Sequence, residues 1–183
     1  MRVIVGVTGA SGALYAERLL GQLEGCVQVD EIALIVTDNG RAVAEHEGVK
    51  LPTGGKIRIA DNHSMFDSVA SGSAAYDAMV VVPCSMGTLG RIASGVSTDL
   101  LCRAADVMLK ERRKLILCSR ETPLSLIHLQ NMERITLAGG VILPASPSFY
   151  SHPSTLLEAC DTVVERIIAQ MGIDAPHFQW SGR

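Results

Sequence analysis

The sequence predicts an open α/β fold, because short apolar runs alternate with helical patterns from one end of the chain to the other. Two of these runs, Arg2–Thr8 and Glu31–Val36, are almost continuously apolar, as in strands that are covered on both faces of a parallel sheet. A third, Ala78–Val82, is followed by Pro83, which we expect to end it. We therefore expect a Rossmann-like three-layer fold, in which a mostly parallel open sheet carries helices on both faces.

The remaining elements continue the same alternation. Shorter strands are expected at Lys56–Ala60, Lys114–Cys118 and Val141–Leu143. Helical periodicity is found over five segments, Ser11–Leu23, Asp38–Glu47, Asp99–Glu111, Leu124–Ala138 and Ser154–Met171. The stretch from position 51 to 73 is irregular and is expected to consist mainly of loops. Because no linker or repeat divides the chain, we expect one domain over residues 1–183, with 171–183 as a tail near the site.

Composition narrows the possible functions. Of the 183 residues, 48% are hydrophobic and the mean hydropathy is +0.27, which excludes a disordered chain. The net charge is −3 and only 4% of residues are aromatic, which argues against a nucleic-acid-binding protein. Charged residues make up 19%, below the value of about 25% that is usual for soluble domains, so we expect part of the surface to be covered.

Cysteine and histidine patterns argue against disulfide and metal chemistry. The five cysteines include no C-x-x-C pair, and an odd number does not suit a disulfide framework. The five histidines show neither H-x-x-x-H nor H-x-H spacing, so we expect no metal site. No window of about 18 uninterrupted apolar residues is present, so we expect no membrane span. Reduced thiols favour a cytoplasmic location.

A glycine-rich loop, Gly6–Gly12 (GVTGASG), joins the first predicted strand to the first predicted helix. Glycines let a backbone approach a phosphate, and a helix start offers free N–H groups and a partial positive charge. The spacing is not G-x-G-x-x-G and the lysine of a P-loop is missing, so the loop predicts a cradle for a nucleotide or phosphate of unspecified kind. The alternative is a tight turn in which Ser11 caps the helix.

Two further loops at the same predicted edge carry polar groups. Ser85, Gly87 and Thr88 follow a buried strand and open a new helix, where they suit a second polar part of a mononucleotide. Cys84 has no histidine or aspartate motif beside it, so we interpret it as a buried structural thiol. The pair Arg120–Glu121 follows the next strand, where a guanidinium suits a phosphate and a carboxylate suits proton transfer.

A dinucleotide reductase is an alternative function, because Asp38 lies just after the second predicted strand, where an acidic residue can bind a ribose hydroxyl. No Tyr-x-x-x-Lys pair supports a short-chain reductase. We prefer to interpret Asp38 as an acid at a helix start, where it complements the helix dipole.

Seven motifs in order resemble those of the UbiX-type flavin prenyltransferases, a family historically described as 3-polyprenyl-4-hydroxybenzoate or aromatic-acid decarboxylases. The resemblance extends from Val3 to about Trp180, essentially the whole chain. The motifs are Thr8–Gly12, Ser71–Ser73, Pro83–Leu89, Arg103–Asp106, Leu109–Arg113, Arg120–Pro123 and Phe149-Tyr150. Such a series is far more specific than any single loop.

The resemblance implies an enzyme that joins a dimethylallyl group from dimethylallyl phosphate to N5 and C6 of reduced FMN, without a metal. The product, prenylated FMN, would serve a UbiD-type decarboxylase, with ubiquinone biosynthesis among the candidate pathways. The family also implies a homo-oligomer, commonly a dodecamer, whose sites lie at subunit contacts and would account for the low charge content. We expect Tyr150 and Arg166 to come from a different subunit than Gly9–Ser11.

Site residues are also implied by similarity. The expected FMN contacts are Gly9, Ala10, Ser11, Thr37, Ser85, Met86, Gly87, Thr88 and Arg120. The residues expected to bind the prenyl phosphate are Arg103, Lys110, Arg120, Glu121, Tyr150 and Arg166, with Trp180 near the site. The candidate catalytic residues are Ser11, Glu47, Lys110 and Glu121. Relatives often carry a lysine where this chain has Asp38, and this difference has no explanation in the sequence.

Two other flavin proteins remain as alternatives. An FMN-dependent cysteine decarboxylase would carry a P-A-S-A-N-T-like loop and a histidine after the first helix. This chain has P-C-S-M-G-T instead and no histidine before His46. A non-catalytic flavin carrier would bind FMN without needing Lys110, Glu121 and Tyr150 together.

Overall fold

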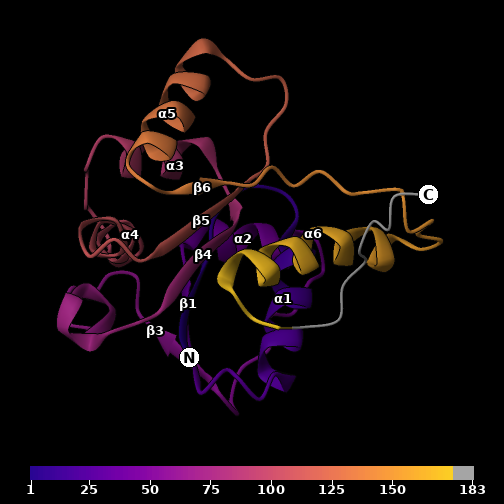
Figure 1. Ribbon diagram of the computed structural model, residues 1–183, viewed down its shortest axis with the longest axis horizontal. Helices are drawn as coiled ribbons and strands as arrows, with labels where there is room; N and C mark the ends of the chain where they lie inside the picture. Colours follow the sequence, from indigo (N-terminus) through magenta and orange to yellow (C-terminus); the bar gives the residue numbers. More distant parts are fainter. Residues whose placement is uncertain (175–183) are drawn as a thin grey trace.

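The computed structural model describes residues 1–174, and their six strands form one parallel sheet in the order β3-β2-β1-β4-β5-β6 (Figure 1). The strands are β1 (Arg2–Val7), β2 (Glu31–Val36), β3 (Ile57–Ala60), β4 (Ala78–Cys84), β5 (Lys114–Ser119) and β6 (Val141–Ile142). The predicted Rossmann-like sheet is therefore confirmed. The order of the strands reverses between β1 and β4, which marks the point where such folds bind ligands.

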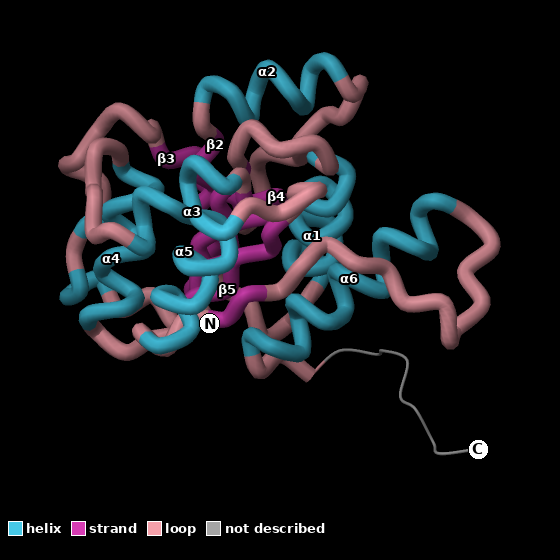
Figure 2. Tube along the Cα trace, turned by 90° about the horizontal axis from the view of Figure 1, so that it is seen from above, coloured by secondary structure: helices cyan, strands magenta, loops and turns pink. Residues whose placement is uncertain are grey.

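Helices cover both faces of this sheet. They are α1 (Ala13–Gly25), α2 (Asp38–His46), α3 (Met86–Ala93), α4 (Leu100–Lys110), α5 (Leu126–Leu137) and α6 (Leu156–Met171), with short 3-10 helices η1 (Ser68–Ala70) and η2 (Gly72–Ala74). Figure 2 shows α1 and α6 on one side of the strands, and α3, α4 and α5 on the other. The ends of the predicted elements agree with the structure within two residues.

Each face of the sheet has its own apolar core, because successive strand residues point to opposite faces. Val3, Val5 and Val7 of β1 pack with the buried leucines of α1 and the buried valines and isoleucines of α6. Ile4 belongs to the second core, together with apolar side chains of α3 and α4. Apolar burial stabilises by about 25 cal/mol per Å², so these two cores fix the loops at the carboxyl edge of the sheet.

Pro83 does not end β4, so that prediction is wrong. The strand continues to Cys84, with a shift in register against β5 after Val81. A proline has no N–H to donate and is tolerated where the hydrogen-bond ladder is irregular. Its carbonyl oxygen still accepts hydrogen bonds from the backbone N–H and the hydroxyl of Thr8, at 3.3 and 2.7 Å.

The first helix begins at Ala13, and the alternative in which Ser11 caps it is wrong. Gly12 occupies the N-cap with φ of 110°, and no side chain caps the helix. A Cβ atom on Gly12 would lie 2.9 Å from Cδ2 of Tyr15. The left-handed backbone and the close ring together require glycine at this position.

A charged cluster ties the amino edge of β1, β2 and β3 together. The carboxylate of Glu31 accepts hydrogen bonds from Arg2 at 2.8 Å, Arg58 at 3.3 Å and the Tyr76 hydroxyl at 2.7 Å. The guanidinium of Arg2 also lies 4.3 Å from the centre of the Tyr76 ring. These hydrogen bonds, that of Arg2 above all, lower the pKa of Glu31 to about 2.

We expect Glu31→Gln to lower the free energy of unfolding by about 1–2 kcal/mol at pH 7, since partly exposed partners are screened by solvent. The pKa of Glu31 is about 2 in the folded chain against an ordinary value of 4.5. Its stabilisation is therefore complete above about pH 4.5 and is lost as the pH falls toward 2. Urea unfolding at fixed protein concentration, at several pH values, measures this.

The matched control for this variant is Glu133→Gln, which changes an exposed glutamate of α5. This control should unfold like the wild type at every pH. A difference between Glu31→Gln and wild type that persists unchanged at pH 2.5 would contradict the lowered pKa.

Candidate active site

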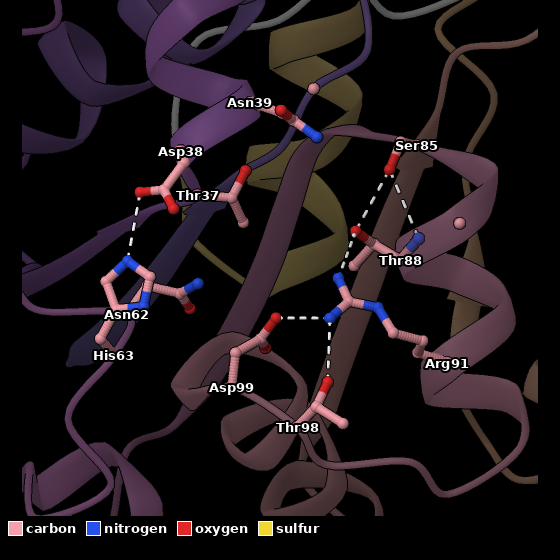
Figure 3. Close-up of a pocket in the computed structure, with 12 residues that line it drawn as sticks. Thr37, Asp38, Asn39, Asn62, His63, Ser85, Thr88, Arg91, Thr98 and Asp99 are labelled. Carbon is pink, nitrogen blue, oxygen red and sulfur yellow. Dashed lines mark hydrogen bonds and ion pairs between the residues drawn. The ribbon is translucent and has the colours of Figure 1, made fainter.

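Two cavities open at the carboxyl edge of the sheet, and the loop after β1 contributes to both. The switch-point cavity, of about 730 Å³, is lined by Gly9, Thr37, Asp38, Asn39, Asn62, His63, Ser85, Gly87, Thr88, Arg91, Thr98 and Asp99 (Figure 3). The Glu47 cavity, of about 410 Å³, is lined by Ser11, Gly12, Leu14, Tyr15, Glu47, Val49, Arg120, Ala145, Leu156 and Cys160. Residues predicted for the site thus occur in both.

Three helices begin at the switch-point cavity. Thr37, Ser85 and Asp99 are the N-caps of α2, α3 and α4, and each side chain accepts a hydrogen bond from a backbone N–H of its helix. All three N-caps line the cavity. The positive ends of three helix dipoles therefore face the same space, which suits an anion such as a phosphate.

Two glycines allow α2 to start directly against the end of β1. A Cβ atom on Gly9 would lie 2.6 Å from Cβ of Asn39, and one on Gly40 would lie 2.6 Å from the carbonyl oxygen of Val7. Any larger residue would push α2 away from the sheet. The close approach brings the start of α2 to the cavity wall.

Arg91, which the sequence reasoning missed, places its guanidinium in this cavity (Figure 3). It donates hydrogen bonds to Asp99 at 2.5 Å, Thr98 at 3.2 Å and Thr88 at 3.3 Å. Burial would raise the pKa of Asp99, but the hydrogen bonds of its N-cap and the charge of Arg91 outweigh burial and lower it. The spacing of three residues between Thr88 and Arg91, which puts both on one helix face, was the available signal.

Asp38 is the first residue of α2, which confirms its interpretation as an acid at a helix start. Its carboxylate lies 3.2 Å from Nε2 of His63, in the loop after β3 (Figure 3). The hydrogen bond to Asp38, and then its charge, raise the pKa of His63. Both side chains are more than two-thirds exposed, at 77% and 68%, so the pair forms part of the rim of the cavity.

Glu47 follows α2 and reaches the start of α1. Its carboxylate accepts hydrogen bonds from the N–H groups of Gly12 at 2.9 Å and Ala13 at 2.8 Å. Burial opposes ionisation, but these bonds, that of the Ser11 side chain and the charge of Arg120 prevail and lower the pKa of Glu47. A protein carboxylate therefore takes the N–H groups of Gly12 and Ala13, and the part of the loop that faces the switch-point cavity is Gly9.

The rest of the Glu47 cavity is mostly apolar. Leu14, Val49 and Leu156 line it together with Tyr15 and Cys160. Burial raises the pKa of the Tyr15 phenol, and the neighbouring Cys160 raises it further. An ionised carboxylate and a guanidinium beside an apolar wall suit a small apolar group that carries an anion.

Three other predicted site residues line neither cavity, and a fourth lies outside the described residues. Ala10 and Met86 are buried, at 8% and 7% exposure. Glu121 is exposed in the loop after β5, where its carboxylate accepts the N–H of the next residue at 3.1 Å. Trp180 lies outside the described residues.

The four remaining residues expected at the prenyl phosphate also lie away from both cavities in this chain. Lys110 ends α4 and is ion-paired with the glutamate that follows it. Because α4 starts at the switch-point cavity and is about 16 Å long, Lys110 lies toward the opposite edge of the sheet. Arg103 is ion-paired one turn along the same helix. Tyr150, before α6, and Arg166, on α6, are both exposed.

Cys84 is fully buried, and burial raises the pKa of its thiol, which agrees with a structural role. All five cysteines are unpaired. Among residues 1–174, no group of three or more His, Cys, Asp or Glu side chains could hold a metal ion. None of the helices in this part of the chain is long and apolar enough to cross a membrane.

Comparison with known proteins identifies the family. The Flavoprotein family model matches residues 1–172. The "Flavin prenyltransferase UbiX" of Methanothermobacter thermautotrophicus is 41% identical over 188 residues, covering 99% of this chain and 96% of that protein. The dodecameric FMN-dependent UbiX-like decarboxylase of Escherichia coli O157:H7 has a TM-score of 0.92 at 37% identity, with both chains fully covered.

A second solved structure contains ligands. It is a UbiX protein (AnUbiX, PadA1) in complex with FMN and dimethylallyl pyrophosphate, with a TM-score of 0.91 and 38% identity. The match covers 100% of this chain and 98% of that one. The resemblance seen in the sequence motifs is thus confirmed, and the chain belongs to the Flavoprotein family and, within it, to the UbiX-type flavin prenyltransferases.

Proposed function

We propose that this protein transfers a dimethylallyl group from dimethylallyl phosphate or pyrophosphate to N5 and C6 of reduced FMN. The observation that carries the proposal is the solved UbiX complex with FMN and dimethylallyl pyrophosphate, whose fold this chain shares over its full length. A cysteine decarboxylase is not favoured, because relatives about 40% identical over the full chain are named flavin prenyltransferases.

The two cavities suggest how FMN lies. Gly9 lines the switch-point cavity, whereas Ser11 and Gly12 line the Glu47 cavity, so a ligand that crosses this loop reaches both. The phosphate of FMN would bind where α2, α3 and α4 begin, because that end of the site attracts anions. The reacting edge of the flavin ring would then face Glu47 and Arg120.

The Glu47 cavity offers the groups that the chemistry needs. Cleavage of the allylic C–O bond releases phosphate and leaves an electron-poor carbon, to which N5 bonds. N5 loses its proton on forming this bond, and protonation of the alkene in the attached group then gives a tertiary cation that bonds to C6. C6 next loses its own proton, which an ionised Glu47 beside Ser11 can accept. Arg120 offsets negative charge in the same cavity, and the apolar wall keeps water from the reactive carbon.

A second subunit would complete the site. In the described chain Arg103 and Lys110 do not reach either cavity, and Tyr150 is 69% exposed on the loop before α6. We propose that a neighbouring copy supplies part of this set, with Tyr150 and Arg166 expected to cross from one subunit to another. The UbiX-like relative from Escherichia coli is dodecameric, and we propose a homo-oligomer of this kind here.

The exposed apolar surface supports such an assembly. Leu126, Ile127 and Leu137 of α5 are 69%, 66% and 82% exposed, and Phe149 and Leu156 are each 72% exposed. Three of these side chains belong to one helix, and exposed apolar surface of this kind is typical of contacts between proteins. Their presence fits the low charge content, because surface between subunits needs few charges.

The product has a proposed destination. Prenylated FMN is expected to serve a UbiD-type decarboxylase, which would take it from this protein. The five unpaired cysteines suit a reducing compartment, so we propose that the reaction takes place in the cytoplasm.

The first test is the reaction itself. Purified protein, mixed anaerobically with reduced FMN and dimethylallyl phosphate, should release a flavin that is heavier by one five-carbon prenyl unit in the mass spectrum. A carrier would return FMN unchanged. Unchanged FMN at full occupancy of the protein, with the pyrophosphate as well as the phosphate, would exclude the proposed reaction.

The second test is Glu47→Gln. The amide keeps an oxygen for the N–H groups at the start of α1 but cannot take up a proton, so we expect prenylation to slow by about 100-fold or more. Single-turnover rates from the mass of the released flavin measure this. The matched control is Glu45→Gln, an exposed glutamate in the last turn of α2, which should react like the wild type. Equal rates for Glu47→Gln and Glu45→Gln would remove Glu47 from the mechanism.

The third test is complementation between inactive subunits. If Glu47 and Lys110 of one site come from different chains, oligomers co-expressed from Glu47→Gln and Lys110→Ala should regain activity. Random pairing of the two kinds of subunit would restore about a quarter of the sites. The same experiment with Tyr150→Phe in place of Lys110→Ala tests whether Tyr150 crosses over. A fully active monomer in solution would overturn the shared site.

A further inference from the structure

Arg91 is the one permanently charged cation among the described residues that line the switch-point cavity. It belongs to the last turn of α3, where a cation could simply complement the helix dipole. Its side chain instead runs back toward the start of the helix, where the guanidinium donates to Thr88 at 3.3 Å. This direction carries the charge away from the end of α3 and into the cavity (Figure 3).

Hydrogen bonds hold the Arg91 guanidinium in place without using all of its N–H donors. It donates to Asp99 at 2.5 Å, to Thr98 at 3.2 Å and to Thr88 at 3.3 Å. An arginine side chain has five N–H donors, so these three bonds leave two for a ligand. A guanidinium that is fixed by several partners loses little conformational entropy when it binds a phosphate.

The charged side chains that line the cavity nearly balance one another, so they do not by themselves attract an anion. Asp38 and Asp99 carry negative charge, and His63, which is paired with Asp38, carries positive charge only when it is protonated. A phosphate monoester brings close to two further negative charges at neutral pH. The helix starts offer N–H groups and partial positive charge, and the remaining N–H donors of the Arg91 guanidinium would strengthen the binding of such a group.

We propose that Arg91 binds the phosphate of the flavin mononucleotide, and that Asp99 is a positioning residue that aims the guanidinium. This inference rests on the proposed function, since it assigns a further residue to the flavin site of that reaction. Ser85 and Thr88, whose hydroxyls lie 3.1 Å apart at the same end of α3, would share the phosphate with Arg91. Riboflavin, which lacks the phosphate, would not use Arg91.

The test compares the affinities of FMN and riboflavin, each titrated into the whole protein and followed by quenching of flavin fluorescence. Arg91→Gln should weaken FMN by about 10- to 100-fold and leave riboflavin unchanged, since a hydrogen bond to a charged group is lost. Arg91→Lys should recover part of the loss. The ratio of the two affinities does not depend on the fraction of folded protein.

Asp99→Asn is the test of positioning. Asparagine still caps α4, so the helix should persist, but the guanidinium loses its charged partner. We expect a loss of FMN affinity smaller than that of Arg91→Gln, and none for riboflavin. The matched control for charge is Arg134→Gln, an exposed arginine of α5, which should keep the wild-type ratio.

Two outcomes would overturn the inference, and they are distinguishable. In the first, the wild-type protein prenylates FMN but the Arg91→Gln variant keeps the wild-type ratio of the two affinities. This result would show that Arg91 does not bind the phosphate, and it would leave the proposed function intact. A wild-type protein that binds neither flavin would contradict the proposed function as well.

Discussion

The parallel pairing of β1 with both of its neighbours is the constraint on which the site depends. Gly6 pairs with Ile35 of β2 on one side and with Val81 of β4 on the other, so all three strands end at the same edge. The chain winds outward from β1 in opposite directions, and the loops that follow these strands therefore separate and leave a crevice. The helices that start there add their dipoles at one place, so topology alone favours an anion before any side chain is considered.

Glu47 removes this attraction for anions at the start of one helix, α1. By accepting the N–H groups of Gly12 and Ala13, its carboxylate neutralises the positive end of α1 and is itself held ionised. The starts of α2, α3 and α4 keep their attraction for anions. A single contact thus divides the carboxyl edge into an anion-binding end and an end where a carboxylate can take up protons. The division depends on the close packing of α2 against β1, which Gly9 and Gly40 permit.

The sequence predicted the fold and the loop residues because both depend on local pattern. Continuous apolar runs identified the buried strands, and Ser85 and Thr88 were found because they follow a strand end. Thr37 was implied by the family resemblance. Arg91 was missed because it lies in the last turn of a helix and reaches the cavity only through its contact with Asp99, which depends on the packing of α3 against α4. The contact between Glu47 and the N–H groups at the start of α1 was missed for a similar reason, since Glu47 lies 35 residues away from Gly12. The contact of Glu47 leaves no periodic signal, and the spacing of Thr88 and Arg91 on one helix face does not by itself show that this face meets α4.

The partners of the arginine and lysine side chains show which of them stabilise the fold and which are available to a ligand. Arg18 of α1 makes two hydrogen bonds, at 2.8 and 2.6 Å, to Asp161 of α6, and so fixes one helix against another. Arg103 and Lys110 are ion-paired with acids on the same helix or just after it, and Arg103 also donates to the carbonyl oxygen of Ala70 at 3.2 Å. Such exposed ion pairs contribute about 0–1 kcal/mol. A phosphate could therefore take over these two cations at little cost to folding. Arg91 combines both properties, because its bond to Asp99 joins two helices while its remaining donors face the cavity.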